Sequence, residues 1–179
     1  MKKTLFLFLM VALAFVGSQM AVAQSKVGVV VGFYNLENLF DTIDNPLTND
    51  EEYLPNGALE WNTMRYESKL KNMAFAISQM PENLAVLGVA EVENAQVMKD
   101  LAAQPTIASR HLEVVHYESP DRRGVDVGLF YNPAFFTYLR SESHRITTEI
   151  PDFVTRDQLV VTGMIAGEEV SIVVVHWPS

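Results

Sequence analysis

The stretch that most constrains the fold is Leu84–Asn94, whose sequence is LAVLGVAEVEN. Its first seven residues are apolar or glycine, which is typical of a strand buried on both faces. Two carboxylates, Glu91 and Glu93, follow directly. Open α/β sheets bind their ligands at the carboxyl ends of such strands. We therefore expect the rest of the protein to be organised around this strand, with a candidate site at the end that carries Glu91.

The flanking segments predict helices and strands in alternation. Apolar residues at helical spacing predict a helix over 64–79, and a second helix over 95–102 is opened by Asn94 or Glu93. Strands are expected over 27–34, 111–117, 125–131, 135–141, 158–165 and 169–175. This order favours an α/β or α+β fold with one mixed sheet and helices on one face. The other face would need a cover that the remaining sequence does not supply.

The first 23 residues have the pattern of a secretory signal peptide. Lys2 and Lys3 form a basic start, an apolar core follows, and the small residues Ala21-Val22-Ala23 precede Gln24. The apolar core is too short for a stable membrane anchor. We therefore expect residues 1–23 to be removed, leaving an exported protein, periplasmic or secreted and of bacterial type, without a transmembrane segment.

Charge and cysteine content limit the possible functions. The whole chain carries a formal charge of −9, and loss of Lys2 and Lys3 changes this to −11. Such a negative field disfavours broad, metal-free binding of nucleic acids, but not a small anionic site built around a divalent ion. The sequence contains no cysteine, which excludes disulfides, thiolate metal sites and cysteine nucleophiles.

The chain ends in an apolar, strand-like run that leads directly to His176 and Trp177. Domains usually finish at the surface with a polar or loosely ordered tail. We therefore expect residues 24–179 to be the N-terminal part of a longer domain whose C-terminal half is missing, with the full-length protein a monomer. The alternative is a natural short protein, a half-fold that dimerises to fill its core.

Four predicted strand ends carry polar side chains that suit metal-assisted cleavage of a phosphoester. Glu91 offers an oxygen ligand for a hard ion such as Mg²⁺ or Mn²⁺. Asn35 can orient a ligand or a water molecule through its amide. Arg123 supplies a planar fork that matches a phosphate. His176 can act as a general acid or base near neutral pH.

Several of these residues also allow a purely structural interpretation. Tyr117 and Asp126 are candidate phosphate contacts together with Arg123, but Arg123 and Asp126 can equally form a cross-strand ion pair. Tyr117 can simply pack. Glu93 is expected to cap the following helix. The other histidines have no partner pattern, and we expect them at the surface: His111, His116 and His144.

Four motifs in order, FYNLEN, GVAEVEN, RRGVDVGLFY and VVVHWPS, resemble the endonuclease/exonuclease/phosphatase superfamily, the fold of DNase I and of bacterial sphingomyelinases. The resemblance covers residues 27–179 and implies an α/β four-layer sandwich, two packed mixed sheets with helices outside, of which about half is present. It implies that Glu91 binds the metal, although Ala90 stands where the family usually has Gln. It also implies catalytic roles for Asn35 and His176 and a phosphate contact at the start of 123–129.

The resemblance implies a Mg²⁺-dependent or Mn²⁺-dependent hydrolase that acts on DNA, RNA or a phospholipid head group, most simply a nuclease-like phosphodiesterase using in-line attack by water. The family's second half normally carries a Gly-Asp-x-Asn motif and a terminal Asp-His pair, and this chain has neither. We therefore expect these 179 residues to be inactive alone. The alternative is an exported, non-catalytic binding module of the same fold.

Overall fold

The computed structural model describes residues 28–177. The signal peptide predicted over 1–23 lies outside the described residues. Within residues 28–177, two helices, two short 3-10 turns and seven strands follow one another: β1 (Val30–Leu39), η1 (Glu51–Tyr53), α2 (Thr63–Ser78), β2 (Leu84–Val92), α3 (Ala95–Ala102), η2 (Ala108–Arg110), β3 (Glu113–His116), β4 (Asp126–Tyr131), β5 (Thr137–His144), β6 (Gln158–Ile165) and β7 (Glu168–Val174).

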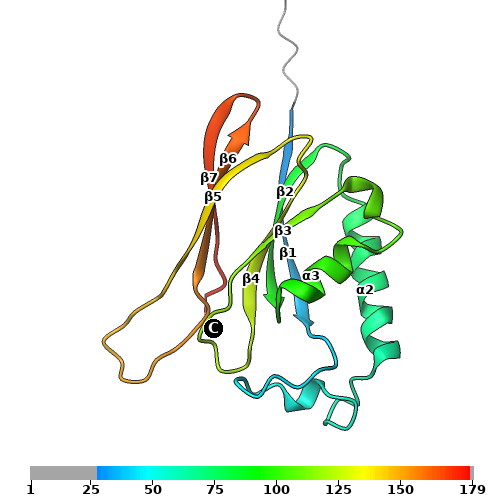
Figure 1. Ribbon diagram of the computed structural model, residues 1–179, viewed down its shortest axis with the longest axis vertical. Coiled ribbons are helices and arrows are strands. Elements are labelled where there is room, and N and C mark those ends of the chain that lie inside the picture. The colour runs from blue at the N-terminus through cyan, green and yellow to red at the C-terminus, as the bar shows by residue number, and fades with distance from the viewer. Residues whose placement is uncertain (1–27, 178–179) are drawn as a thin grey trace, which may run out of the picture.

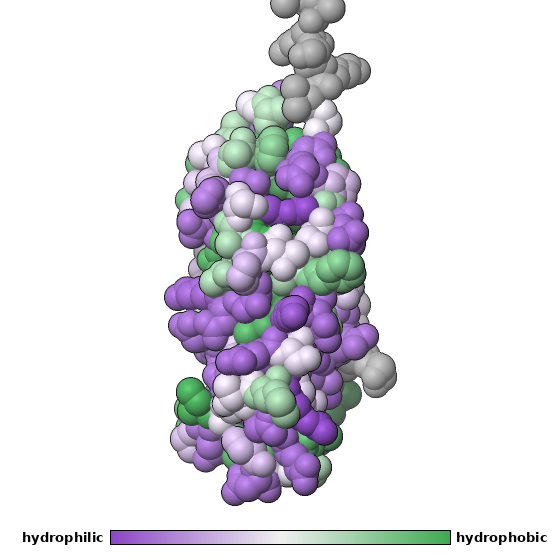
Figure 2. Space-filling view, turned by 90° about the vertical axis from the view of Figure 1, so that its right-hand side faces the viewer, coloured by the Kyte–Doolittle hydropathy of each residue, from purple (hydrophilic) through white to green (hydrophobic). Residues whose placement is uncertain are grey.

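The first sheet is mixed and has the strand order β1-β2-β4-β3. β1 and β2 are parallel, whereas β4 runs antiparallel to both of its neighbours. The strand that the sequence analysis placed at the centre, β2, is indeed an inner strand, and almost all of it is buried. Both helices, α2 and α3, cover one face of this sheet, as predicted (Figure 1). The side of the molecule that carries them is mostly hydrophilic, with scattered apolar side chains (Figure 2).

The second sheet, β5-β6-β7, is antiparallel and packs on the other face of the first sheet (Figure 1). Val86 and Leu129 from the first sheet share one buried cluster with Leu159, Val161 and Val174 from the second. The expectation that nothing in the sequence covers this face is therefore wrong. Apolar residues on β6 and β7 supply the cover, because these strands form a sheet of their own.

The layers are thus helices, mixed sheet and antiparallel sheet. Two packed sheets with helices outside agree with the fold class predicted from the family resemblance. In the described part of the chain, helices cover the mixed sheet only, so three layers of the predicted four are seen. No helix within residues 28–177 is both long enough and apolar enough to cross a membrane.

Candidate active site at the ends of β1 and β2

A bulge at the end of β2 determines where Glu91 points. Val89 and Val92 both pack on the helix side of the sheet, although they are three residues apart. Strict alternation would place Glu91 on that side with Val89. Instead Glu91 is an inserted residue with φ of 61°, and the pairing with β4 shifts between Ala90 and Val92. The Glu91 carboxylate consequently leaves the helix side and turns toward β7, where it meets His176.

β1 contains a matching bulge, so it is longer than the predicted strand. Leu36 and Leu39 both pack on the helix side, and the residues between them, Glu37 and Asn38, have φ of 52° and 60°. Asn35 precedes this bulge and lies on the opposite face. Because β1 and β2 are parallel, their carboxyl ends meet at the same edge of the sheet.

Asn35 and Glu91 form a direct hydrogen bond at this edge. The Asn35 amide Nδ2 donates to Glu91 Oε1 over 3.0 Å. The amide cannot easily turn, because its own Oδ1 accepts a hydrogen bond of 2.7 Å from the Glu37 backbone N–H. Asn35 therefore fixes one oxygen of the Glu91 carboxylate and leaves the other available.

His176 follows β7 and approaches the same carboxylate, with its Nε2 3.5 Å from Glu91 Oε1. Its Nδ1 is buried and has no hydrogen-bond partner among residues 28–177. Burial lowers the pKa of His176, and the positive charges of Arg156 and Arg123 lower it further, although Glu91 opposes them. The imidazole is therefore mainly neutral at neutral pH, so one ring nitrogen can accept a proton and the other can donate a hydrogen bond.

Two arginines lie close to this group. Arg123 belongs to the turn before β4, is mostly exposed and has its Nε 3.5 Å from Asp121 Oδ1. Arg156 lies just before β6, is buried and has its Nε 3.5 Å from Asp121 Oδ2. Both charges act on the pKa of His176. The sequence analysis selected Arg123 but missed Arg156. The position of Arg156 just before an apolar strand is the sequence feature that could have identified it.

A lysine borders the site from the helix layer and was also missed. Lys69 on α2 donates to the backbone carbonyl of Glu37 in the β1 bulge, and its ammonium lies 5.7 Å from the centre of the Trp61 ring. Burial lowers the pKa of Lys69, whereas the charges of Glu37 and Glu91 raise it. The site therefore has a cation on its helix side as well as the arginines on its other side.

The remaining predicted contacts lie elsewhere. The Tyr117 hydroxyl is bonded to Ser141 on β5, at 3.1 Å from its backbone oxygen and 2.9 Å from its hydroxyl. On β4, Asp126 points to the same face as Gly128 and Phe130, and this face packs against the helices. Asp126 therefore lies on the opposite side of the sheet from Glu91. The alternative pairing of Arg123 with Asp126 is not formed, because Arg123 pairs with Asp121.

Two expectations about nearby polar residues are wrong. The side chain of His116 is only 2% exposed and faces Asp126, because position 116 lies on the inward face of β3. Glu93 does not cap α3. Asn94 does, accepting from the backbone N–H groups of Gln96 and Val97, while Glu93 instead accepts a hydrogen bond from the Asp41 backbone N–H.

The donors at the end of β1 and β2 suit a hard divalent ion. Glu91 is partly exposed and offers one carboxylate, whose second oxygen is not used by Asn35. Mg²⁺ is commonly held by only one or two carboxylates, with water and substrate phosphate as the other ligands. The residues present therefore fit such an ion, and Glu91 is the side chain that would hold it.

Three comparisons with known proteins relate the chain to others. The family model described as "Endonuclease/Exonuclease/phosphatase family" matches residues 30–179. A solved structure of ANGEL2, described as a 2',3'-cyclic phosphatase, is similar with a TM-score of 0.46 and 12% sequence identity. That similarity covers 80% of this chain and 39% of the ANGEL2 chain, so the chain spans well under half the length of that protein. No curated protein matches the sequence.

Proposed function

Since the chain belongs to the endonuclease/exonuclease/phosphatase family, we propose that the protein is a divalent-metal-dependent phosphoesterase whose site includes Glu91, Asn35 and His176. The observation that carries the proposal is the convergence of an amide and an imidazole on one carboxylate oxygen of Glu91. The three residues come from β1, β2 and the segment after β7, far apart in the sequence. Such a constellation suits metal-assisted hydrolysis of a phosphoester.

Each residue has a distinct task in this proposal. Glu91 would hold the ion, Mg²⁺ or Mn²⁺, and the ion when bound supplies positive charge to the phosphate. Asn35 is a positioning residue, because its amide keeps the Glu91 carboxylate in one orientation. His176 is mainly neutral at neutral pH, so its N–H can donate a hydrogen bond to a phosphate oxygen or to the leaving-group oxygen, and its other ring nitrogen can accept a proton from the attacking water.

The cations around the site favour a substrate with an anionic phosphate, and we propose a phosphodiester. Arg123 is exposed enough to reach a phosphate group, and Arg156 holds Asp121, which also faces Arg123. An arginine offers two parallel N–H donors to a phosphate. The protein as a whole is acidic, so we propose a local phosphate subsite rather than a long nucleic-acid groove. DNA, RNA and phospholipid head groups share this phosphodiester chemistry.

Hydrolysis by protein expressed from its complete gene tests the proposal. Bis-p-nitrophenyl phosphate, DNA, RNA and sphingomyelin are offered with Mg²⁺ or Mn²⁺, with and without EDTA. We expect EDTA-sensitive release of product from at least one substrate. Substitution His176→Ala should lower kcat by roughly 10²-fold to 10⁴-fold, which is the usual contribution of general acid–base catalysis. His144→Ala is the matched control, because His144 also lies beside a glutamate but on the far edge of the second sheet.

Two results would count against this function. One is the absence of EDTA-sensitive hydrolysis of every substrate offered, combined with measurable binding of a phosphodiester, which is what a non-catalytic binding module of the same fold would give. The other is equal loss of activity in His176→Ala and His144→Ala, which would mean that the assay reports general damage and not the chemistry of this site.

A further inference from the structure

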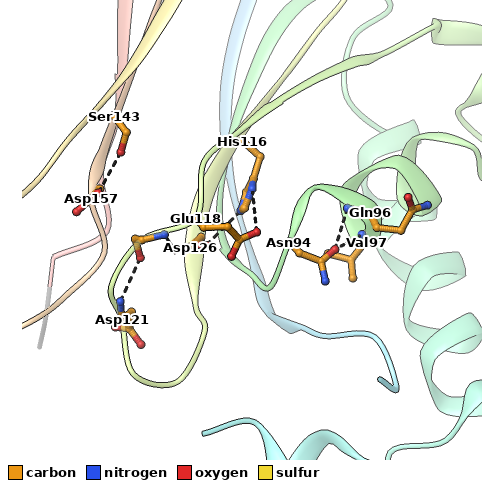
Figure 3. A network of polar contacts seen from close by, with 10 residues as sticks. Asn94, Gln96, Val97, His116, Glu118, Asp121, Asp126, Ser143 and Asp157 are labelled. Atoms are coloured by element: carbon orange, nitrogen blue, oxygen red, sulfur yellow. Dashed lines mark hydrogen bonds and ion pairs between the residues drawn. The ribbon is translucent and has the colours of Figure 1, made fainter. Parts of the chain in front are cut away.

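We propose that His116, Glu118 and Asp126 form a binding site for a divalent transition metal ion, with Zn²⁺ as the best chemical match. One ligand atom from each of the three side chains lies within 4.8 Å of the other two. His116 is at the end of β3, Glu118 is in the loop that follows, and Asp126 begins β4, so the three side chains meet at one end of the first sheet (Figure 3). The proposal does not depend on the proposed phosphoesterase function.

The strongest observation is the environment of His116. Its side chain and that of Asp126 are each only 2% exposed, and His116 Nε2 lies 3.3 Å from Asp126 Oδ2. Despite this distance, Nε2 has no partner in hydrogen-bond alignment within the described part of the chain. Buried polar atoms of this kind nearly always have a partner. A tetrahedral zinc ion with bonds of about 2.0–2.1 Å keeps neighbouring donor atoms roughly 3.3 Å apart, which matches the observed separation.

The Asp126 carboxylate is already oriented for such a role. Its Oδ1 accepts a hydrogen bond of 3.1 Å from the Ser119 backbone N–H, which leaves Oδ2 directed at His116. Carboxylates that bind metals are commonly held by a second hydrogen bond of this type. Glu118 provides the third donor, because one of its ligand atoms lies within 4.8 Å of the ligand atoms of both His116 and Asp126. Since the Glu118 side chain is mostly exposed, this side of the site is open to water, which can complete the coordination.

This site is separate from the one at Glu91. Asp126 lies on the helix side of the first sheet, as do Gly128 and Phe130 on the same strand. Glu91 is turned to the other side by its bulge and meets His176 there. The two sites also differ in chemistry. An imidazole nitrogen together with two carboxylates favours zinc over magnesium, whereas the single Glu91 carboxylate, which Asn35 only positions, suits magnesium.

An ion at this position would join the two ends of the loop between β3 and β4. His116 is the last residue of β3, Glu118 is near the start of the loop, and Asp126 is the first residue of β4. The loop also carries Asp121 and Arg123, the ion pair next to His176. We therefore infer a structural role, in which zinc stabilises the loop that presents Arg123 to the proposed phosphate subsite.

Calorimetric titration with Zn²⁺ tests this site. The chelator-treated protein from the complete gene is titrated in the presence of excess Mg²⁺, and thermal unfolding is followed with and without zinc. We expect one zinc ion per chain and a rise in the unfolding midpoint on binding. Glu118→Gln changes an exposed side chain, so the variant should fold, and it should bind zinc roughly tenfold to 100-fold more weakly. His144→Ala and Glu91→Gln should bind as the unsubstituted protein does.

Three results would overturn the proposal. The first is no zinc binding by the unsubstituted protein, which would mean that His116 contacts the two carboxylates directly and needs no ion. The second is unchanged zinc affinity in Glu118→Gln. The third is loss of binding in Glu91→Gln, which would assign the zinc to the other site.

Discussion

At the scale of single residues, the hydrogen bond between Asn35 and Glu91 determines how the Glu91 carboxylate is held. One Glu91 oxygen receives the Asn35 amide, and His176 lies near that same oxygen. A carboxylate in a β-bulge with positive φ has few other restraints from its own strand. The orientation of Glu91 therefore depends on its neighbours more than on β2.

Substitution Asn35→Ala tests this dependence. The amide donor is lost, so the Glu91 carboxylate can rotate, and we expect kcat to fall by roughly tenfold to 100-fold with little change in KM, as for other residues that orient a metal ligand. Steady-state hydrolysis of bis-p-nitrophenyl phosphate measures both constants. Asn72→Ala is a suitable control, because Asn72 is an exposed asparagine on α2. Equal kcat values for Asn35→Ala and Asn72→Ala would contradict the positioning role.

Glu93 gives a prediction about pH and stability. It is 4% exposed, and burial raises its pKa to about 7, with the charges of Asp41 and Asp50 adding to the effect. In the unfolded chain the pKa is near the ordinary value of 4.5. Between these two values the folded state binds more protons, so this group lowers the stability as the pH rises through that range.

Substitution Glu93→Gln removes this titration while keeping an oxygen that can accept from the Asp41 backbone N–H. We expect the variant to be more stable than the unsubstituted protein by roughly 1–3 kcal/mol at about pH 8, and the difference to shrink at about pH 5. Urea unfolding in EDTA at both pH values measures it. If the variant and the unsubstituted protein differed in stability by the same amount at both pH values, the folded state would not raise the pKa of Glu93.

At the same scale, residue types predicted the site only in part. Asn35, Glu91 and His176 were identified because each follows an apolar run, and the structure brings them into contact. Arg156, Lys69 and His116 were not identified. Arg156 offered one local signal, its position just before an apolar strand, whereas Lys69 and His116 become informative only when the packing of two distant elements is known.

At the scale of elements, local signals located most helices and strands. α3 begins where Asn94 predicted it, because the asparagine side chain accepts two backbone hydrogen bonds at the start of the helix. β6 has the predicted bounds, since turn residues flank its apolar run. β1 continues to Leu39, beyond the predicted end. Its bulge at Glu37 and Asn38 interrupts the alternation of apolar residues, which is the signal used to follow a strand.

Gly163 on β6 provides a test of how closely the second sheet is packed. A Cβ at this position would lie 2.5 Å from the Thr137 carbonyl oxygen and would also overlap the Phe136 ring. Gly163→Ala should therefore destabilise the protein by about 2 kcal/mol or more. Gly28→Ala is the matched control, with nothing within 4 Å of the added atom and an expected effect within about 0.5 kcal/mol. Urea unfolding measures the stability of both variants. Equal unfolding midpoints for Gly163→Ala and Gly28→Ala would contradict the close contact of Gly163 with Thr137 and Phe136.

At the scale of the whole molecule, the sequence did not reveal that β5, β6 and β7 form a second sheet. Alternation shows which residues of a strand face a core, but not which strands share a sheet. Val161 and Val174 were recognisable as buried, yet their partners Val86 and Leu129 lie far away in the sequence. Only the family resemblance predicted two packed sheets.

Export is a prediction at this scale. The pattern of residues 1–23 places the cleavage site before Gln24. Mass spectrometry of protein recovered from the cell exterior or periplasm should find Gln24 as the first residue. Recovery of protein that begins at Met1, in the cytoplasmic fraction alone, would contradict both the signal peptide and the proposed export.

The central claim is that the Glu91 carboxylate holds the ion needed for hydrolysis, and one comparison of rates tests it most directly. Mg²⁺-dependent hydrolysis of bis-p-nitrophenyl phosphate is measured for Glu91→Gln and for the control Glu142→Gln. Glu142 also lies beside a histidine, with its Oε1 3.2 Å from His144 Nε2, but it belongs to the second sheet. We predict that kcat/KM falls by about 100-fold or more in Glu91→Gln, since a bound ion contributes several kcal/mol, and that Glu142→Gln keeps the full rate. An unchanged rate in Glu91→Gln would contradict the claim.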